Sequence, residues 1–155
     1  MKPIFWFGII ALIFGAIAGY QLLHFGKLDS SVMAAPPEAH LKLGDLWLDV
    51  YVADSATERQ RGLGGREYLA QDQGMIFVFS EDGSYTFWMK DMHFPIDILW
   101  LASDGRIVTI APHVAPDTYP EKTFSPTEPA RYVLEVNAGF VDAQGVEEGD
   151  YVHFQ

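Results

Sequence analysis

A long apolar run near the N-terminus constrains this chain more than any other feature. Residues 4–23, IFWFGIIALIFGAIAGYQLL, include no charged side chain. At about 1.5 Å of rise per residue, a helix of this length spans the roughly 30 Å hydrocarbon core of a bilayer. The run is longer than the about 7–15 apolar residues of a cleavable signal, and it closes with Tyr20, Gln21 and His24 instead of a small-x-small cleavage site. We therefore predict an uncleaved transmembrane helix through which the chain is bound to a membrane.

Few charges decide how this helix is oriented. Lys2 precedes the run, whereas the positive charge of Lys27 after it is offset by Asp29. Positive charge tends to stay on the cytoplasmic side, so the N-terminus is predicted inside and the rest of the chain outside the cytoplasm. Small residues near Ala35 leave one alternative open, in which the signal is cleaved and the domain is secreted or periplasmic.

The chain divides into three parts. Residues 1–24 form the predicted anchor, residues 25–39 have no apolar period and indicate a linker, and residues 40–155 have the length of a single globular domain. Gly15 and Gly19 make a G-x-x-x-G step, which allows a weak dimer through the anchor.

Charge and cysteine content exclude several functions. From His40 onward there are eight Lys and Arg residues against nineteen Asp and Glu residues, a net charge of −11. Binding to nucleic acid needs a basic face, so no nucleic-acid partner is predicted. The absence of cysteine excludes disulfides, thiolate metal sites and thiol redox chemistry. No cofactor and no metal are predicted.

Hydrophobic patterning predicts an α+β domain. Apolar residues alternate on both sides of Gly44-Asp45, which indicates a hairpin, and Asp104-Gly105 is a second hairpin turn. Thr57 and Gln60 predict a capping box at the start of a short helix, which a glycine cluster ends. Further strands are predicted over 74–80, 85–90, 96–102, 106–111, 131–136 and 151–154, a second helix over 138–144, and a loop over 112–129. The fold predicted is a mostly antiparallel, curled β-sheet or partly open barrel with two short helices, preceded by the transmembrane helix.

Several consecutive blocks of the sequence resemble one family. They are ERQRGL at 58–63, GMIFVF at 74–79, FWMKDMHFPIDILWL at 87–101, DGRIV at 104–108, PARYVLEVNAG at 129–139 and GD at 149–150. Together they resemble domain-of-unknown-function family 192, an uncharacterised conserved family of bacteria and archaea. The resemblance implies a small β-rich domain, often behind a signal or anchor, and implies no reaction. Gly64 and Asp91-Met92 depart from the usual family wording, beside its most specific residues.

An anion-binding pocket is the main candidate site. In the predicted strand 85–90, Trp88 and Lys90 share one face. If Arg61 and Arg66, together with Arg59, approach that face, half of the domain's cations gather in one place, suited to a carboxylate, a sugar acid or a phosphate. The plainer interpretation, which the excess of carboxylates favours, is that each cation forms a surface ion pair.

The resemblance points to a set of polar positions as site residues: Arg61, Arg66, Lys90, Asp97, Glu135 and Asn137. Asp97 opens an apolar strand, where a carboxylate needs a partner, and an arginine would satisfy it. Glu135 alternates with apolar residues and could face outward. Asn137 is most simply interpreted as the cap of the following helix.

These observations favour a membrane-anchored, extracytoplasmic domain that binds a small polar, anionic or carbohydrate ligand near Arg66, Trp88 and Lys90 without catalysis. Two alternatives stay open: an envelope hydrolase that uses Asp97 or Glu135 as acid or base, and a module that binds another protein through an exposed aromatic patch. A copper site is only weakly indicated. Its ligands would be Met89, Met92, His93 and His113, which follow no recognised spacing.

Overall fold

One curled sheet organises the chain in the computed structural model, which describes residues 36–155. The elements are β1 (Ala39–Leu43), β2 (Leu46–Ala53), α2 (Ala56–Arg61), β3 (Gln73–Gly83), β4 (Ile96–Leu101), β5 (Ile107–Val114), the 3-10 helix η2 (Pro116–Thr118), β6 (Ala130–Asn137), α3 (Phe140–Gln144) and β7 (Val152–Phe154). The strands lie in the order β5-β4-β6-β3-β2-β1-β7. Neighbouring strands are antiparallel except β2 and β3, whose parallel pairing requires the crossover through α2.

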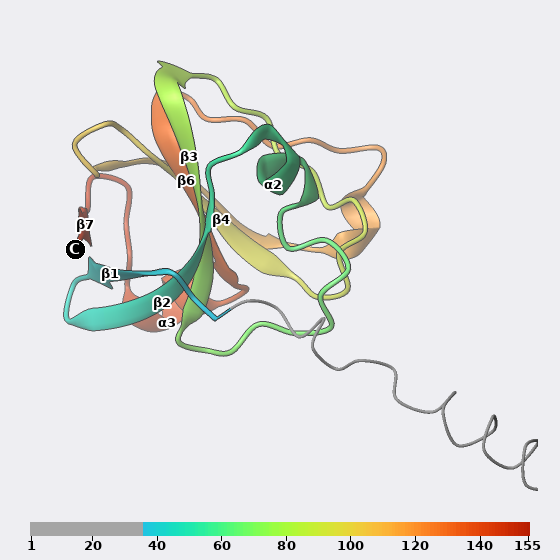
Figure 1. Cartoon of the computed structure of the whole chain (residues 1–155), viewed down its shortest axis with the longest axis horizontal. Coiled ribbons are helices and arrows are strands. Elements are labelled where there is room, and N and C mark those ends of the chain that lie inside the picture. Colours follow the sequence, from blue (N-terminus) through green and yellow to red (C-terminus); the bar gives the residue numbers. More distant parts are fainter. Residues whose placement is uncertain (1–35) are drawn as a thin grey trace, which may run out of the picture. The chain divides into compact units, whose positions relative to one another are not determined.

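The two edges of the sheet approach each other, so the sheet forms a partly open barrel (Figure 1). The Ile107 N–H donates to the carbonyl oxygen of Asp150 at 2.8 Å, and the Val152 N–H donates to that of Gly105 at 2.9 Å. These bonds link the start of β5 to β7 and satisfy backbone groups that an open edge would expose. The predicted α+β fold, with a curled sheet and the two short helices α2 and α3, is confirmed for this part of the chain.

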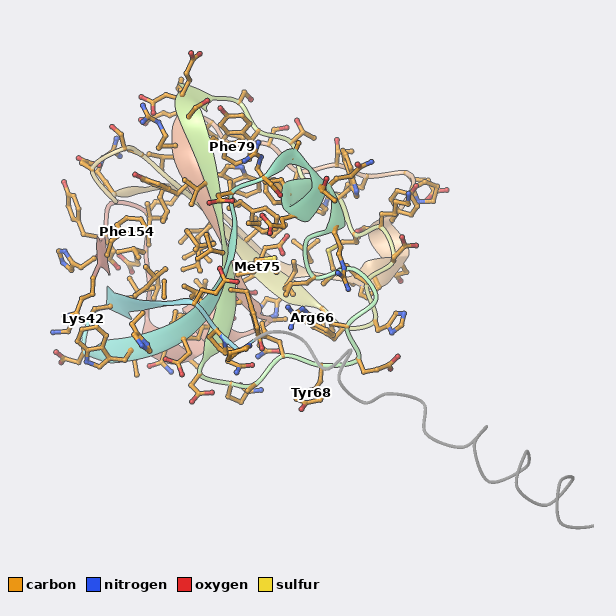
Figure 2. The ribbon with its side chains drawn as sticks, in the orientation of Figure 1. Lys42, Arg66, Tyr68, Met75, Phe79 and Phe154 are labelled. Carbon is orange, nitrogen blue, oxygen red and sulfur yellow. The ribbon has the colours of Figure 1, made fainter. Side chains whose placement is uncertain are left out.

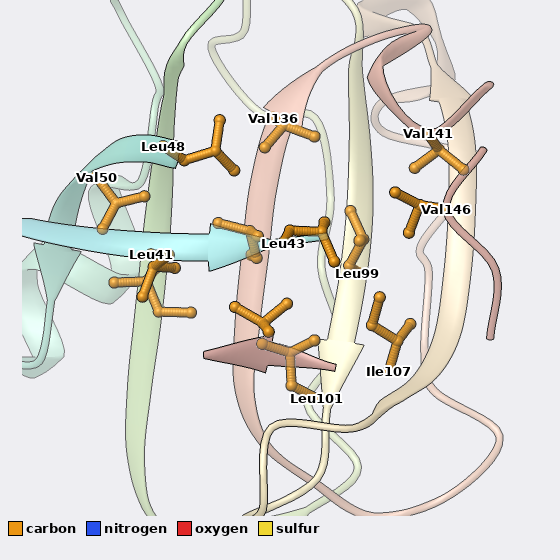
Figure 3. Packing of buried hydrophobic residues seen from close by; sticks show 13 residues of the cluster. Leu41, Leu43, Leu48, Val50, Leu99, Leu101, Ile107, Val136, Val141 and Val146 are labelled. Carbon is orange, nitrogen blue, oxygen red and sulfur yellow. The ribbon is translucent and has the colours of Figure 1, made fainter. Parts of the chain in front are cut away.

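The concave face of the sheet encloses an inner core of aliphatic side chains. Leu99 and Leu101 point inward from β4, and Leu134 and Val136 point inward from β6, as alternation along a strand requires. Figure 3 shows Leu99 and Val136 facing Leu43 of β1 and Leu48 of β2, with Val141 of α3 at one side. The buried members are Leu41, Leu43, Leu48, Val50, Ile76, Leu99, Leu101, Ile107, Leu134, Val136, Val141, Val146 and Val152.

The convex face carries a second, outer core that is rich in aromatic residues. In Figure 1, α2 lies on the opposite side of β3, β4 and β6 from β1 and β7. The indole N–H of Trp100 donates to the carbonyl oxygen of Tyr85 at 2.8 Å, which ties the segment after β3 to this face. The buried members are Ala53, Leu63, Leu69, Met75, Phe77, Met89, Ile96, Ile98, Trp100, Val108, Val114, Ala130 and Val133. Helix α2 and the segment after β3 therefore cover the convex face, so a cavity can form between them and the sheet.

Some predicted boundaries are wrong. Residues 85–90 form no strand of the sheet, and only Phe87 pairs with Phe124 as an isolated bridge. Their alternation is still real, because Phe87 and Met89 turn toward the outer core while Trp88 and Lys90 turn toward solvent. β3 continues to Gly83 and β5 to Val114, so the predicted loop over 112–129 is shorter and contains η2. β6 and β7 match their predicted positions within one or two residues.

The N-cap of helix α2 lies two residues before the predicted cap, Thr57. Ser55 is the N-cap: its hydroxyl accepts the N–H of Glu58, and the Glu58 carboxylate accepts the N–H of Ser55 at 3.0 Å. The Ser55 hydroxyl also donates to the Glu58 carboxylate at 2.7 Å, and this bond, together with that from the Ser55 N–H, lowers the pKa of Glu58. The negative charge of a glutamate in the first turn also interacts favourably with the helix dipole. The uncharged Gln60 of the predicted box with Thr57 would not provide this interaction. The predicted end at the glycine cluster is confirmed, with Gly62 as the C-cap.

Several predictions fall on residues outside the described part: the transmembrane helix over 4–23, the glycine pair at 15 and 19, cleavage near Ala35 and most of the linker over 25–39. Residues 36–155 form one compact unit, which contains the predicted domain. No helix among these residues has the length and hydropathy needed to cross a bilayer.

Candidate functional site

A cavity of about 330 Å³ opens on the convex face of the sheet. Three layers of chain form it: α2 with the glycine turn behind it, the outer face of β3 and β6, and the segment that follows β3. We call it the outer cavity. Its lining residues are Arg59, Gln60, Arg61, Gly62, Leu63, Gly64, Phe77, Phe79, Tyr85, Thr86, Phe87, Trp88, Lys90, Met92 and Glu135.

Glu135 is the buried acidic group of the outer cavity. It lies on β6 between Met75 of β3 and Ile98 of β4, and its side chain points outward because Leu134 and Val136 point into the barrel. Only 4% of the residue is exposed. Its Oε2 atom has no hydrogen-bond partner in the described part of the chain. Burial raises the pKa of Glu135 from 4.5 to about 8, so the carboxyl is mainly protonated at neutral pH.

Aromatic rings form the walls around this carboxyl. The ring of Phe77 meets that of Phe87 edge to face, with centroids 4.8 Å apart, while Phe79 and Tyr85 stack at 3.4 Å. Trp88 lines the cavity and is 46% exposed. Ring pairs of this kind fix each other's orientation and present flat apolar surfaces to the space between them. The walls are therefore suited to the apolar face of a ring-shaped ligand.

Arg59 is held in place by the protein itself. Its guanidinium donates to the carbonyl oxygens of Asp54 and Val78, the second at 2.9 Å, and it lies 5.1 Å from the ring centroid of Phe79. These hydrogen bonds both come from Nη1 and connect α2 to β3. Arg59 therefore supports the wall of the outer cavity and contributes positive charge there.

Arg61 and Lys90 are the cations available to a ligand. Among residues 36–155, neither forms an ion pair, so the interpretation that every cation pairs with a carboxylate is wrong for both. The Gly65 N–H donates to the Asp91 carbonyl oxygen at 2.8 Å, which joins the end of α2 to the Lys90 turn. A Cβ atom at Gly64 would lie 2.9 Å from the Arg61 carbonyl oxygen. It would also lie 3.3 Å from the Lys90 carbonyl oxygen, so glycine permits the close approach of the two turns that carry these cations.

The predicted site residues divide into two groups. Arg61, Trp88, Lys90 and Glu135 line the outer cavity, and their role in binding remains a prediction. Arg66 does not: its guanidinium carbon lies 3.8 Å from the ring centroid of Tyr51. Figure 2 shows Arg66 well away from Phe79. The predicted convergence of Arg66 with Lys90 is therefore wrong, because a cation–π contact to β2 holds Arg66 elsewhere.

Asp97 is a structural residue on the other face of the sheet. Its carboxylate is fully buried and accepts the N–H groups of His113 at 2.8 Å, Gly139 at 3.2 Å and Val141 at 2.9 Å. The expected arginine partner is replaced by these backbone donors. Asp97 pairs in register with Val136, whereas Glu135 pairs with Ile98, so the two carboxylates point to opposite faces.

Asn137 also has a structural role, but it does not cap a helix. Its side-chain amide donates to the carbonyl oxygens of Leu69 at 3.0 Å and Ala70 at 2.9 Å. The N-cap of α3 is Gly139, which provides no side-chain cap, so the predicted capping role is wrong. Asn137 instead attaches the chain before β3 to the end of β6.

The weakly indicated copper ligands are engaged separately. His93 contacts Glu67 at 3.2 Å and His113 contacts Asp142 at 2.7 Å, while Met89 is buried in the outer core. The bond to Asp142, with a smaller contribution from the charge of Asp97, raises the pKa of His113. No group of three or more His, Asp or Glu side chains within residues 36–155 is arranged to hold a metal ion.

Sequence reasoning missed the aromatic members of the cavity other than Trp88. Phe77 and Phe79 lie two residues apart on β3 and line the cavity with Tyr85 and Phe87. The run 74–80 is almost entirely apolar, which hid the alternation. Alternation counted from Met75 would have placed Phe77 and Phe79 on the face that carries Glu135, since Met75 and Glu135 are paired in register.

Comparisons with known proteins agree with this fold. A crystal structure of a candidate transcription regulator from Sinorhizobium meliloti 1021 shares 36% sequence identity, with a TM-score of 0.70, over 77% of this chain and 94% of that one. A protein of unknown function from Novosphingobium aromaticivorans DSM 12444 shares 28% identity, with a TM-score of 0.70, over 83% of this chain and 99% of that one. No curated protein matches the sequence.

Residues 39–154 match the family described as DUF192, Uncharacterized ACR. The match contains every strand from β1 to β7 and every residue of the outer cavity. It also confirms the resemblance that the sequence blocks indicated. The chain therefore belongs to domain-of-unknown-function family 192.

Proposed function

We propose that this protein binds a small polar anion in the outer cavity and catalyses no reaction on it. The observation that carries the proposal is the position of Arg61 and Lys90, two cations without ion pairs among the described residues, beside aromatic walls. In a domain with a net charge of −11, a non-specific anion is repelled, so binding requires local cations. Arginine and lysine both bind carboxylates and phosphates through charge-assisted hydrogen bonds.

The hydrolase alternative has less support. A glycosidase uses two carboxyl groups on either side of one bond, within about 5–9.5 Å of each other in a shared cleft. Asp97 and Glu135 point to opposite faces of the sheet, and three backbone donors already engage Asp97. Glu135 alone could move a proton, but the outer cavity has no second acidic side chain among its described lining residues to work with it.

A role in transcription also has less support here, although one similar crystal structure is described in such terms. DNA binding needs a basic face, and residues 40–155 have eight basic residues against nineteen acidic ones. Only three basic side chains of the described chain meet at the outer cavity, and the Nη1 group of Arg59 among them already donates to carbonyl oxygens.

The proposal places this domain outside the cytoplasm, anchored by residues 4–23. The charge difference across that apolar run supports the orientation. We expect the full chain to stay with the membrane after an alkaline carbonate wash, and the domain to be digested by protease added outside spheroplasts. A chain that is washed off, or whose N-terminus is found near Ala35, would show that the domain is released.

Removing Arg61 and Lys90 should weaken anion binding strongly. The double variant R61A/K90A is expected to bind D-glucuronate at least tenfold more weakly than the unmodified chain, because each charge-assisted hydrogen bond contributes about 1.5–3 kcal/mol. Isothermal titration calorimetry on the full chain in nonionic detergent measures the affinity. Glucose 6-phosphate and a short acidic peptide test the other anion classes in the same way.

Matched controls use cations that lie away from the outer cavity. R66A removes an arginine that packs on Tyr51, and K42A removes a lysine of β1 that Figure 2 shows on the far side of the ribbon from Arg66. Both variants should keep the affinity of the unmodified chain. Equal losses in the controls and in R61A/K90A would mean that general charge, and not this cavity, attracts the anion.

A further inference from the structure

The buried carboxyl of Glu135 indicates which chemical group the ligand carries at the end opposite its anionic group. Resting on the proposed function, we infer that the ligand presents an uncharged hydroxyl or amide group to Glu135, which meets it as a neutral carboxylic acid. Anion binding is then coupled to the proton on Glu135. The ligand class that this assigns is a sugar acid of one ring, with its carboxylate at Arg61 and Lys90.

The geometry gives Glu135 an unmet hydrogen-bonding need. Its Oε2 atom is buried without a partner in the described chain, and its neighbours in the adjacent strands are the apolar Met75 and Ile98. A buried polar atom without a partner costs about 1–3 kcal/mol. A neutral carboxylic acid donates one hydrogen bond and accepts others, which matches a hydroxyl group in both directions. A ligand that supplies this group removes the cost when it binds.

The charged groups around Glu135 favour a neutral partner over an ammonium group. Helix α2 contributes Arg59 and Arg61, and the segment after β3 contributes Tyr85 and Lys90. The neighbouring strands β3 and β4 contribute apolar side chains at the paired positions. A ligand ammonium would meet three positive charges in one small cavity. Burial also raises the pKa of Glu135 to about 8, which leaves it uncharged and unable to offset those charges at neutral pH.

The size and walls of the cavity fit one ring. A volume of about 330 Å³ lies at the lower end of the range for small-molecule sites. Aromatic side chains such as Phe87 and Trp88 provide flat surfaces for the apolar face of a pyranose ring. The ring then connects a carboxylate at the cations to hydroxyl groups at Glu135. Cyclohexanecarboxylate has the same ring size and charge without hydroxyl groups, so it serves as the matched probe.

The test compares D-glucuronate with cyclohexanecarboxylate by calorimetry on the full chain in detergent. The affinity for glucuronate should fall about tenfold between about pH 7 and about pH 9, as Glu135 loses its proton. E135Q, which resembles the protonated acid, should bind glucuronate with a flat pH profile. E135L should lose the preference for glucuronate over cyclohexanecarboxylate. Circular dichroism of each variant confirms that it is folded.

The outcomes separate this inference from the proposed function. If neither probe binds, or R61A/K90A changes nothing, the anion site itself is wrong and the inference falls with it. If glucuronate binding depends on Arg61 and Lys90 but is independent of pH and unaffected by E135L, the inference alone is overturned. Affinity that rises with pH, or that E135Q abolishes, would show that Glu135 binds as a carboxylate and would also overturn it.

Discussion

Replacing Asp97 by asparagine is expected to destabilise the domain by about 3–5 kcal/mol, a large part of the stability of a domain this size. The carboxylate is fully buried and accepts the N–H groups of His113, Gly139 and Val141. Hydrogen bonds to a charged acceptor contribute about 1.5–3 kcal/mol each. These donors belong to the end of β5, to the turn after β6 and to α3, so one side chain connects three segments.

Asparagine is the informative substitution because it keeps the shape of the side chain. Its amide nitrogen replaces one acceptor oxygen and would face a backbone N–H, so at least one donor is left unsatisfied. Urea unfolding followed by circular dichroism measures the loss. The control is D72N, at an exposed aspartate in the turn before β3, which should leave the midpoint unchanged. A midpoint for D97N equal to that of the control would show that the backbone donors find other partners.

The sequence predicts the sheet well where one face of a strand is buried. In β1 and β2 the alternation around Gly44 gives both the strands and the turn, and Gly44 has the positive φ of 61° that a tight turn requires. In β4 and β6 the alternation is masked, because both faces are covered and every residue of β4 is buried. Apolar runs and flanking turns predict those strands, but they do not reveal the face on which Asp97 or Glu135 lies.

The sequence does not predict which residues distant along the chain contact one another. Alternation over 85–90 correctly separates Trp88 from Met89, but it does not reveal that this segment covers the sheet instead of joining it. Arg61 and Arg66 look equivalent in sequence. The glycine turn between them sends Arg61 to the outer cavity and Arg66 to Tyr51. Likewise, the sequence predicts an arginine partner for Asp97, because backbone donors that are distant along the chain leave no pattern in it.

Glu135 should make the stability of the domain fall as pH rises from about 5 to about 8. Burial raises the pKa of Glu135 to about 8 in the folded chain, against 4.5 for an exposed glutamate. Below pH 4.5 both the folded and the unfolded chain hold the proton, and there is no effect. Between the two pKa values the unfolded chain releases the proton while the folded chain keeps it, so unfolding becomes easier by about 1.4 kcal/mol per pH unit. Above about pH 8 both states are ionised and the loss is constant.

The substitution E135Q isolates this effect from the other titrating groups. Glutamine has no proton to lose, so the difference in unfolding free energy between E135Q and the unmodified chain should grow by several kcal/mol from about pH 5 to about pH 8. Urea titrations of both proteins across that range measure it, with E121Q, at an exposed glutamate, as the matched control. Parallel curves for E135Q and E121Q would mean that Glu135 is ionised in the folded protein. Because a ligand hydroxyl that pairs with the neutral acid stabilises the folded state, glucuronate should protect the unmodified chain most below about pH 8.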